Sequence, residues 1–494
     1  MKKHLSLLII AMLFSIISAF AQDCDYFGTT GELQWCLKSG TLIISGEGEM
    51  PDYFLNAPWK KYGYNIHTVV IESGVTSIGK WAFWDINITS MFIPKNIASI
   101  GNSAFSDCRF LTSFEVESEN IYYTSKNGVL FNQDKTAIIC YPAGKGDEYV
   151  IPNSVTHIGN YAFESCDNLI SITIPESVTN IGEGAFRACT NLTLMIIPDN
   201  VISIGLGAFI GCTSLSSMVI PNSVISIGEC AFCGCINLMS IIISNQITTI
   251  EMYTFSSCEG LTSITIPKGV NSIDPYAFQY CENLTSITNL NPVPVAINSD
   301  VFMGVTQNTC TLRVPTSSVQ AYKDADIWKN FNIIGGDYHV QVIADNNTHG
   351  YTIGDGLYAT NEIATVTAIA KFDYKFANWT KEGIEVSTNN PYSFTVTEDM
   401  ELVANFENNV DIKNTEVAAV KIYPNPTAGE LKIESGELKI ENVKIIDIHG
   451  RNLSHHQSIP SSSHKMNISH LPAGIYFVKI STTTGEIFRK VVRE

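Results

Sequence analysis

Charge is scarce in this sequence of 494 residues, and positive charge is scarcer still. Only 16% of the residues are charged, and 48 acidic residues against 30 basic ones give a formal net charge of −18. Proteins that bind nucleic acids or anionic membrane surfaces do so through clusters of Lys and Arg. The sequence has no basic run and no stretch in which basic and aromatic residues interleave. We therefore expect no nucleic-acid partner.

Long apolar runs are missing after the N-terminus, so we expect no transmembrane span. The apolar run Leu5–Ile17 follows Lys2 and Lys3 and precedes the A-x-A sequence Ala19–Ala21. A basic region, a short apolar core and a small-residue cleavage site are typical of a secretory signal peptide. We predict a signal peptide over residues 1–21 and a mature protein that is secreted or lies on the outer cell surface.

Motifs that carry catalysis are also missing. No H-E-x-x-H, G-x-S-x-G, P-loop or G-x-G-x-x-G sequence stands in a supporting context, and the acidic residues are scattered without a pair that spacing would bring together. His455 and His456 lie in a stretch rich in Ser and His, where a solvated loop is a simpler interpretation than a metal site. We predict no enzyme, no catalytic or cofactor-binding residue, no cofactor and no metal.

A repeat fills the middle of the chain. Its unit can be written I-G-x-x-A-F-x-x-C-x-x-L-x-x-I-x-I-P-x-x-V-x-x, and from Phe163 to Phe278 it recurs every 23 residues. A fixed period of this length indicates a solenoid, because one unit cannot bury its apolar side without its neighbours. The phenylalanine that marks each unit stands at Phe83, Phe105, Phe163, Phe186, Phe209, Phe232, Phe255, Phe278 and Phe302.

The spacing inside the unit predicts its local structure. Phe209, Cys212 and Leu215 are three residues apart, which suits a tight turn or a short 3₁₀ segment with one face inward. Leu215, Met218 and Ile220 follow the pattern L-x-x-I-x-I, which predicts a short strand with alternate residues buried. The proline after Ile220 ends the strand because it has no N–H to donate.

The unit resembles the BspA-like, or type-5, leucine-rich repeat over roughly residues 69–335. The resemblance implies a curved solenoid, here residues 67–336, with a parallel sheet on its concave side. It also implies an N-terminal β cap, which we assign to residues 22–66. Cys24 and Cys36 flank a turn in that cap and are a candidate disulfide.

Two further segments interrupt or end the repeat. Thr316–Phe331 has the pattern of an amphipathic helix with Thr316 or Ser317 as N-cap, and it could cover the last repeat as a C-terminal capping helix. Residues 117–148 break the period, and the sequence Asn127-Gly128 within them is typical of a β-hairpin turn. We predict that this hairpin projects from the solenoid.

The period is lost after the solenoid, and residues 337–407 contain alternating apolar and polar segments that predict a small β domain. The domain resembles the divergent internalin-B-type repeat, which is common in bacterial surface proteins and whose usual role is spacer or adhesive module. The resemblance rests on Tyr374, Phe376, Trp379, Tyr392, Phe394, Asp399, Leu402, Ala404 and Phe406.

The polar residues 408–417 predict a linker, and residues 418–494 resemble the C-terminal sorting domain of type IX secretion cargo. The resemblance rests on Lys421–Thr427, Val443–Gly450 and Leu471–Tyr476. It implies an Ig-like β-sandwich, the type IX secretion machinery as a partner, and passage across an outer membrane. It also implies removal of the domain, with release or covalent attachment to surface lipopolysaccharide. The fold class we predict is therefore mostly β throughout.

One cysteine recurs in each repeat. A straight file of thiols at a spacing of ~4.8 Å does not converge on a metal ion, and parallel side chains hold the Cβ atoms too far apart for easy disulfides. We predict buried free thiols that act as small apolar side chains. Cys230 and Cys233 are additional to the pattern, and we expect a local disulfide or two half-exposed thiols there. The repeated cysteines are Cys108, Cys166, Cys189, Cys212, Cys235, Cys258 and Cys281.

The outward positions of the predicted strands lie five and seven residues after each repeated cysteine. Most are Ser or Thr, whereas Leu194, Ile196, Val219 and Ile242 are apolar and fall on three neighbouring repeats. Exposed apolar patches often mark binding sites, so these four residues form a candidate binding patch. The alternative is that aliphatic, mostly β-branched side chains stack along the sheet without binding anything.

These observations favour a secreted or cell-surface protein that acts by non-covalent binding. Family resemblance suggests adhesion to host matrix or host-cell proteins, or to other bacteria, through an extracellular protein ligand. One alternative is glycan binding for nutrient capture, which exposed aromatic residues such as Tyr122, Tyr123 or Tyr141 would support. A second alternative is a passive surface spacer.

Overall fold

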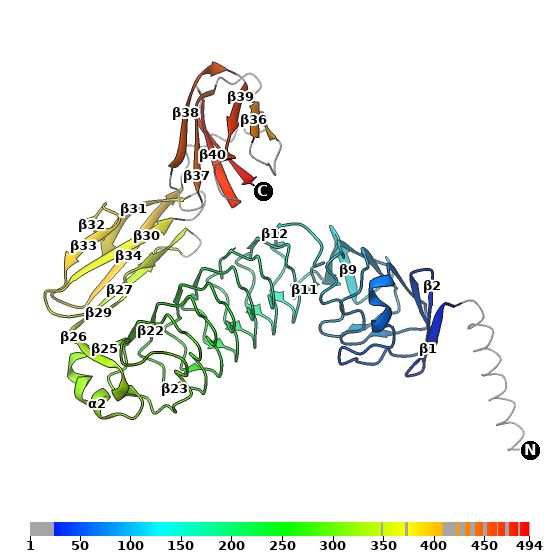
Figure 1. The fold of residues 1–494 in the computed structure, drawn as a ribbon, viewed down its shortest axis with the longest axis horizontal. Coiled ribbons are helices and arrows are strands. Elements are labelled where there is room, and N and C mark those ends of the chain that lie inside the picture. The colour runs from blue at the N-terminus through cyan, green and yellow to red at the C-terminus, as the bar shows by residue number, and fades with distance from the viewer. Residues whose placement is uncertain are drawn as a thin grey trace, which may run out of the picture. The chain divides into compact units, whose positions relative to one another are not determined.

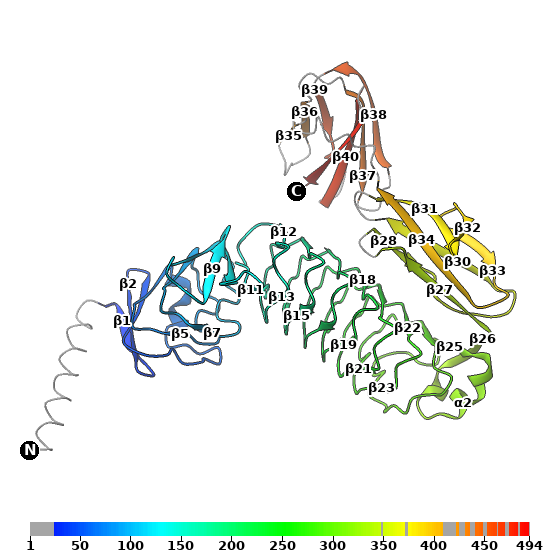
Figure 2. The same cartoon turned by 180° about the vertical axis from the view of Figure 1, so that it is seen from behind.

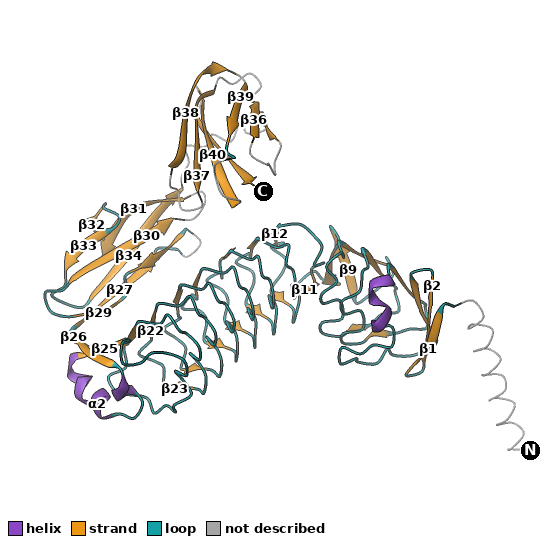
Figure 3. Ribbon diagram, in the orientation of Figure 1, coloured by secondary structure: helices purple, strands orange, loops and turns teal. Residues whose placement is uncertain are grey.

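The computed structural model describes residues 24–346, 349–370 and 374–408, and residues 421–493 with short gaps. The predicted signal peptide lies outside the described residues, as does the predicted linker apart from its first residue. Strands and turns make up almost all of the described structure, and the helical segments are short (Figure 3).

The N-terminal cap is a four-stranded sheet in the order β1-β2-β3-β4. The first three strands are antiparallel neighbours, and β4 joins β3 in parallel, which begins the parallel stacking of the solenoid. Trp35, Trp59 and Leu42 are buried in its core. The elements are β1 (Tyr26–Thr30), β2 (Leu33–Lys38), β3 (Thr41–Ser45), the 3₁₀ helix η1 (Lys60–Asn65) and β4 (Thr68–Ile71).

The solenoid is a row of stacked coils in which each coil contributes a strand to one face, as both ribbon views show (Figure 1, Figure 2). We call this face the ladder face. It is the predicted strand of the repeat: Met218 and Ile220 are buried, and Val219 between them is half-buried. Its strands are β6 (Ser90–Ile93), β8 (Ser113–Val116), β12 (Glu148–Val150), β14 (Ser171–Thr173), β16 (Leu194–Met195), β18 (Ser217–Val219), β20 (Ser240–Ile242), β22 (Ser263–Ile266), β24 (Ser286–Asn289), β25 (Thr311–Pro315) and β26 (Asn332–Gly336).

A second row of parallel strands runs along the opposite side of the coils, and sequence reasoning did not foresee it. Each of these strands is only two residues long, so it has no alternation that a sequence pattern could reveal. The strands are β5 (Ser77–Ile78), β7 (Ser99–Ile100), β13 (His157–Ile158), β15 (Asn180–Ile181), β17 (Ser203–Ile204), β19 (Ser226–Ile227), β21 (Thr249–Ile250) and β23 (Ser272–Ile273).

The marker phenylalanines stack along the solenoid axis. From Phe163 to Phe278, adjacent ring centroids are 5.0 to 5.7 Å apart and the planes differ by 2° to 15°. Stacked aromatic pairs of this kind contribute about 0.5–1.5 kcal/mol each beyond the burial of their area. The turn that carries each ring is also tied to the next coil, because the Phe186 N–H donates to the Ala208 carbonyl at 2.7 Å.

Glycine at the turn of the repeat is required by the close approach of neighbouring coils. A Cβ atom on Gly205 would lie 2.6 Å from the backbone nitrogen of Glu183 in the preceding coil. Backbone atoms cannot move aside as the end of a flexible side chain can. The I-G pair of the repeat therefore sets the spacing between coils.

The hairpin within residues 117–148 does not project from the solenoid, contrary to the sequence prediction. Val129, Leu130 and Phe131 are all buried, with Leu130 in the N-terminal hydrophobic core and its two neighbours in the C-terminal one. A strand that is apolar on both sides has to be covered on both sides, so the hairpin is held inside the stack. Its strands are β9 (Tyr123–Lys126), β10 (Val129–Asn132) and β11 (Ala137–Cys140).

The C-terminal cap is helical, but the predicted single helix is broken into three pieces. Pro315 rather than Thr316 or Ser317 precedes the first piece, and no side chain caps it. Ile327 has a φ of 68°, which ends helical geometry and turns Trp328 into the core, edge-on to Phe302 at 5.6 Å. The free energy gained by burying the Trp328 indole exceeds the gain from continuing the helix. The pieces are η2 (Thr316–Ser318), α2 (Val319–Asp324) and η3 (Trp328–Asn330).

The small β domain begins directly after β26. Strand β27 pairs with β29 in antiparallel and with β34 in parallel, β30 pairs with β33, and β31 pairs with β32. Trp379, Val366 and Leu402 are buried. The strands are β27 (Tyr338–Ala344), β28 (Gly350–Ile353), β29 (Gly356–Tyr358), β30 (Ile363–Ala370), β31 (Tyr374–Lys381), β32 (Ile384–Ser387), β33 (Tyr392–Thr395) and β34 (Met400–Asn408).

The C-terminal domain consists of two sheets, in the orders β35-β36-β39 and β38-β37-β40-β41. Ile433 of the first sheet and Val443 and Val478 of the second belong to one buried cluster, as expected for a β-sandwich. Parts of the three sequence blocks that carried the sorting-domain resemblance lie outside the described residues. The strands are β35 (Lys421–Tyr423), β36 (Glu430–Glu434), β37 (Ile440–Asp447), β38 (Asn452–Ser461), β39 (Ser463–Asn467), β40 (Gly474–Thr482) and β41 (Gly485–Arg493).

Candidate functional site

The ladder face carries the predicted binding patch. Val219 and Ile242 are register partners on β18 and β20, and both side chains are half-buried with one side toward solvent. Ile196 is also half-buried and lies just past the end of β16. Leu194 pairs with Ser171 in the backbone ladder, and its side chain is not among those described. The structure therefore places three of the four predicted residues at partly exposed positions of neighbouring coils.

Small hydroxyl side chains flank this patch. Ser217 pairs with Ser240 beside it, and Thr265 pairs with Thr288 two coils further along. These positions are half-buried, and strands β14 to β24 contain no aromatic and no charged residue. The patch is thus an aliphatic area within a flat, uncharged and weakly polar surface.

The ladder face is less continuous than the sequence predicted. Hydrogen-bonded pairing joins β12, β14 and β16, then β18 and β20, then β22 and β24, with breaks between these groups. One break falls between Ile196 and Val219, so the patch lies on two separately paired groups of strands. The repeat pattern could not reveal the break, because both sides of it match the same consensus.

All seven repeated cysteines lie inside the solenoid and are fully buried free thiols. The thiol of Cys212 donates to the carbonyl oxygen of Phe186 at 3.1 Å, and Cys235 and Cys258 bond in the same way to Phe209 and Phe232 at 3.2 Å. Burial raises the pKa of Cys212 well above the ordinary value for a thiol, so the nucleophilic thiolate is suppressed.

Sequence reasoning assigned these cysteines to burial and missed the hydrogen bond. Each acceptor is the marker phenylalanine 26 residues earlier, in the preceding coil. The constant spacing of Phe and Cys within the repeat could have indicated this hydrogen bond. The offset between neighbouring coils, however, is known only from the structure. The thiol is therefore both a small apolar filler and a link between coils.

The remaining cysteines divide into two groups. Cys24 and Cys36 form a disulfide with a Cα–Cα distance of 5.6 Å, which ties the start of the chain to β2. Cys230 and Cys233 are half-buried and free. Cys230 has a φ of 56° at the place where the two preceding coils have Gly184 and Gly207, so this turn keeps its left-handed backbone without glycine.

The described residues contain no group of three or more His, Cys, Asp or Glu side chains positioned to hold a metal ion. They also contain no helix that is long and apolar enough to cross a membrane.

Residues 62–133, 138–223 and 203–325 match the family described as BspA type leucine rich repeat region, in six copies. These ranges together cover more than half of the chain. The chain belongs to the BspA-type leucine-rich repeat family. This confirms the resemblance drawn from the 23-residue unit, and it confirms the solenoid as the fold of that region.

Two further family matches describe the rest of this BspA-type protein. Residues 340–410 match the divergent InlB B-repeat domain, and residues 421–494 match the secretion system C-terminal sorting domain. Both confirm the resemblances drawn from sequence. The sorting domain indicates handling by type IX secretion and export to the cell surface.

Solved structures of bacterial leucine-rich repeat proteins are among those that match the chain. A leucine-rich repeat protein from Eubacterium ventriosum is 22% identical, and the match covers 63% of this chain and 92% of that one, with a TM-score of 0.35. The pneumococcal vaccine antigen PcpA is 15% identical over 64% of this chain and 99% of its own, with a TM-score of 0.40. A leucine-rich repeat protein from Bacteroides ovatus is 21% identical over 63% and 100%, with a TM-score of 0.22. No curated protein matches the chain.

Proposed function

We propose that this BspA-type protein is a surface adhesin that binds an extracellular protein, from the host or from another bacterium, through the ladder face. The observation that carries the proposal is the pairing of Val219 with Ile242, with Ile196 nearby, on strands β14 to β24, where the other described outward side chains are Ser and Thr. Apolar side chains that remain partly exposed gain by being covered, at about 25 cal/mol per Å² of area removed from water. The role we propose for the ladder face is binding without turnover.

The chemistry of this face favours a protein ligand over a sugar. Glycan sites generally stack sugar rings on exposed aromatic side chains, and strands β14 to β24 carry none. Of the three tyrosines that could have supported glycan binding, Tyr141 is buried and Tyr123 is half-buried, with its hydroxyl accepting from the Ile100 N–H. Tyr122 is exposed. Phe92 of β6 is exposed as well, outside β14 to β24, and these separate rings are a weaker basis than the aliphatic patch.

The test is a double substitution on the patch, Ile196→Ser with Ile242→Ser, in the full chain. Proteins from host matrix and from neighbouring bacteria would be retained on immobilised wild type and identified by mass spectrometry. We expect the double variant to bind the retained proteins at least about 10-fold more weakly, since each lost aliphatic contact costs about 1 kcal/mol or more.

The chain offers a matched control. Ile202 and Ile225 lie outside the ladder-face strands and are 47% and 59% exposed, so Ile202→Ser with Ile225→Ser makes the same chemical change elsewhere on the coils. The proposal requires the control to bind as wild type does. Equal retention by the patch variant and the wild type would overturn it. Retention of glycans alone on an array would favour the nutrient-capture alternative, and retention of nothing would favour a passive spacer.

A further inference from the structure

Several bonds fix the joint between the solenoid and the small β domain. The solenoid and most of that domain lie in one compact unit of the chain. The guanidinium of Arg313 on β25 donates to both carboxylate oxygens of Glu362, at 2.8 and 3.0 Å. The Asp337 carboxylate accepts from the N–H and the hydroxyl of Thr360, at 2.8 and 2.7 Å. A bidentate pair between Arg and a carboxylate sets orientation as well as distance.

The backbone at the joint is packed as closely. One residue, Asp337, separates β26 from β27, and its N–H donates to the Tyr358 carbonyl at 2.8 Å. A Cβ atom on Gly336 would lie 2.6 Å from the Cβ of Leu357, whose side chain is buried. The small β domain is therefore held against the end of the ladder by packing and hydrogen bonds, and not by the chain connection alone.

A groove of about 1010 Å³ lies beside this joint. Its lining combines residues of the ladder-face strands β18, β20, β22 and β24 with residues of β27 and β34 of the small β domain. We call it the junction groove, its ladder-face residues the floor and its β-domain residues the wall. The residues that matter here are Val219, Ile242 and Thr265 on the floor and His339, Asp399 and Glu401 on the wall.

The floor offers apolar contact to a chain of several residues. Val219 and Ile242 are the paired, half-buried members of the ladder-face patch. The four strands of the floor belong to successive coils, and at about 4.8 Å per coil the floor is about 14 Å long. That length matches about four residues of an extended chain. None of the described residues that line the groove is Phe, Tyr or Trp, so the lining gives a sugar ring nothing to stack on.

Carboxylates dominate the charged groups of the junction groove. An oxygen of Asp355 lies 3.2 Å from the His339 ring, and Asp399 accepts from the His339 N–H at 2.7 Å and remains exposed. Glu401 is exposed and has no hydrogen bond or ion pair with any described residue. Negative charge that the protein does not neutralise therefore lies beside an aliphatic floor. The charged and titratable residues of the lining are Asp337, Asp355, Asp399, Glu401, Lys268 and His339.

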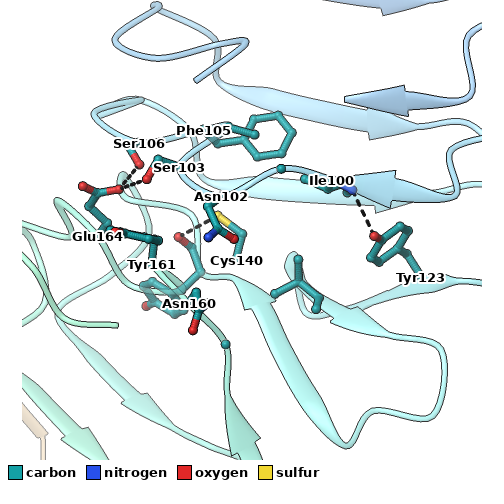
Figure 4. Close-up of a pocket in the computed structure, with 15 residues that line it drawn as sticks. Ile100, Asn102, Ser103, Phe105, Ser106, Tyr123, Cys140, Asn160, Tyr161 and Glu164 are labelled. Atoms are coloured by element: carbon teal, nitrogen blue, oxygen red, sulfur yellow. Dashed lines mark hydrogen bonds between the residues drawn. The ribbon is translucent and has the colours of Figure 1, made fainter. Parts of the chain in front are cut away.

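A second cavity shows what an internally satisfied carboxylate looks like. It measures about 170 Å³, lies beside the inserted hairpin, and is lined by residues 100–106 and by Glu164 among others (Figure 4). The Glu164 carboxylate accepts from the Ser103 hydroxyl at 2.7 Å and from the Ser106 hydroxyl. Glu401 in the junction groove has no such donors, so its charge is available to a ligand.

We propose that the junction groove binds an extended segment of a partner protein in which Lys or Arg alternates with aliphatic residues. Successive side chains of an extended chain point to opposite sides, so the aliphatic set can lie on Val219 and Ile242 while the basic set turns toward Asp399 and Glu401. Opposite charge speeds encounter, and like charge excludes acidic segments. This inference rests on the proposed function, because its floor includes part of the ladder-face patch. The small β domain is then part of the binding site and not a spacer.

The first test uses three blocked peptides and the full chain. The probe is acetyl-Lys-Val-Lys-Val-Lys-Val-amide, and its counterparts carry Ser or Glu in place of Lys. Isothermal titration calorimetry measures their binding. We expect the Lys peptide to bind at least about 10-fold more tightly than the Glu peptide, with the Ser peptide between them, and salt to narrow the difference through screening. Equal affinities, or no binding of the Lys peptide, would overturn the proposal.

Two substitutions of opposite sign locate the effect in the groove. Glu401→Lys should weaken binding of the Lys peptide at least about 5-fold, and Lys268→Glu should strengthen it about 2-fold or more, since both side chains are exposed residues of the lining. Glu382→Lys is the matched control, because Glu382 is exposed, lies outside the lining, and gives the same change in net charge. Equal effects of Glu401→Lys and Glu382→Lys would mean that only net charge matters, and would overturn the site.

The same variants distinguish this inference from the adhesin proposal. Partner proteins that are lost from Ile196→Ser with Ile242→Ser but are retained fully by Glu401→Lys would uphold the ladder face as the binding surface and overturn the basic segment. Equal retention of partner proteins by the patch variant and the wild type, together with discrimination among the three peptides, would uphold the groove and overturn the adhesin proposal.

Discussion

The regular coils of residues 159–289 and the irregular coil of residues 117–150 are built from similar residues but satisfy their backbones differently. In the regular coils each turn donates to the next, and the phenylalanines, the thiols and the glycines repeat in the same places. In the irregular coil a hairpin of β9 and β10 is inserted, and the apolar residues of β10 are buried on both sides.

The difference shows that a regular coil and an interrupted coil are held in the same stack by different contacts. A coil whose partners are all supplied by its neighbours has no backbone group left for a ligand, so it can bind only through side chains on its face. A coil that departs from the period is held in the stack by its insertion, since the apolar residues of β10 are buried on both sides.

The largest effect that separates the two regions should come from the stacked rings. Phe209→Ala removes a fully buried ring that stacks on Phe186 and Phe232, and we expect a loss of about 3–5 kcal/mol in the stability of the coils around it. Hydrogen exchange with mass spectrometry on the full chain should show faster exchange in the coils on both sides. Phe92→Ala is the control, since that ring is 45% exposed, and a comparable effect there would contradict the role of stacking.

A smaller effect should come from the turn glycines. Gly205→Ala places a Cβ 2.6 Å from the backbone of the preceding coil, and we expect a loss of about 1–3 kcal/mol from the displacement that follows. Gly146, in the irregular coil, has nothing within 4 Å of the added carbon, so Gly146→Ala should change stability by less than about 0.5 kcal/mol. Urea unfolding followed by circular dichroism measures both. Equal losses would show that coil spacing is not set at Gly205.

The smallest effect concerns the dependence of stability on pH. Burial raises the pKa of Cys281 to about 12, so the folded chain keeps this proton between about pH 9 and 12 while the unfolded chain loses it. The unfolded state then binds fewer protons, and stability falls as pH rises, by about 1.4 kcal/mol per pH unit for this thiol. The contribution is fully present below about pH 9.

Substitution isolates that thiol from the others. Cys281→Ala should make the fall in unfolding free energy between pH 9 and 10 shallower by that amount, as measured by urea titration at each pH. Cys230→Ala, at a half-buried position, should change the slope less. An unchanged slope in Cys281→Ala would mean that the thiol ionises in the folded coil.

The sequence was sufficient for the burial pattern that the period imposes. Phe209, Cys212 and Leu215 are buried as their spacing predicted, and Met218 and Ile220 face inward on the predicted strand. The repeat predicts burial well because each coil packs against two neighbours. A residue at a repeat position therefore has to fit both of them. The half-buried state of Val219 and Ile242 follows from the same alternation.

The features that the sequence did not predict all depend on how neighbours are offset. Asn127-Gly128 indicated a hairpin, but it could not show that β10 would be covered on both sides. The amphipathic pattern of the C-terminal cap predicted one helix, and the positive φ of Ile327 arises only because Trp328 has to reach Phe302. The acceptors of the thiols likewise need the distance between coils.

The hydrogen bond from each cysteine to the phenylalanine of the coil before it bears on how this gene can change. Each of these bonds joins a regular coil to its neighbour, and the same atoms are offered at both of its faces. Duplication or loss of one 23-residue unit would therefore re-form the same bonds across the new junction and leave both caps in place. The ladder face can thus change in length by whole coils without a compensating substitution.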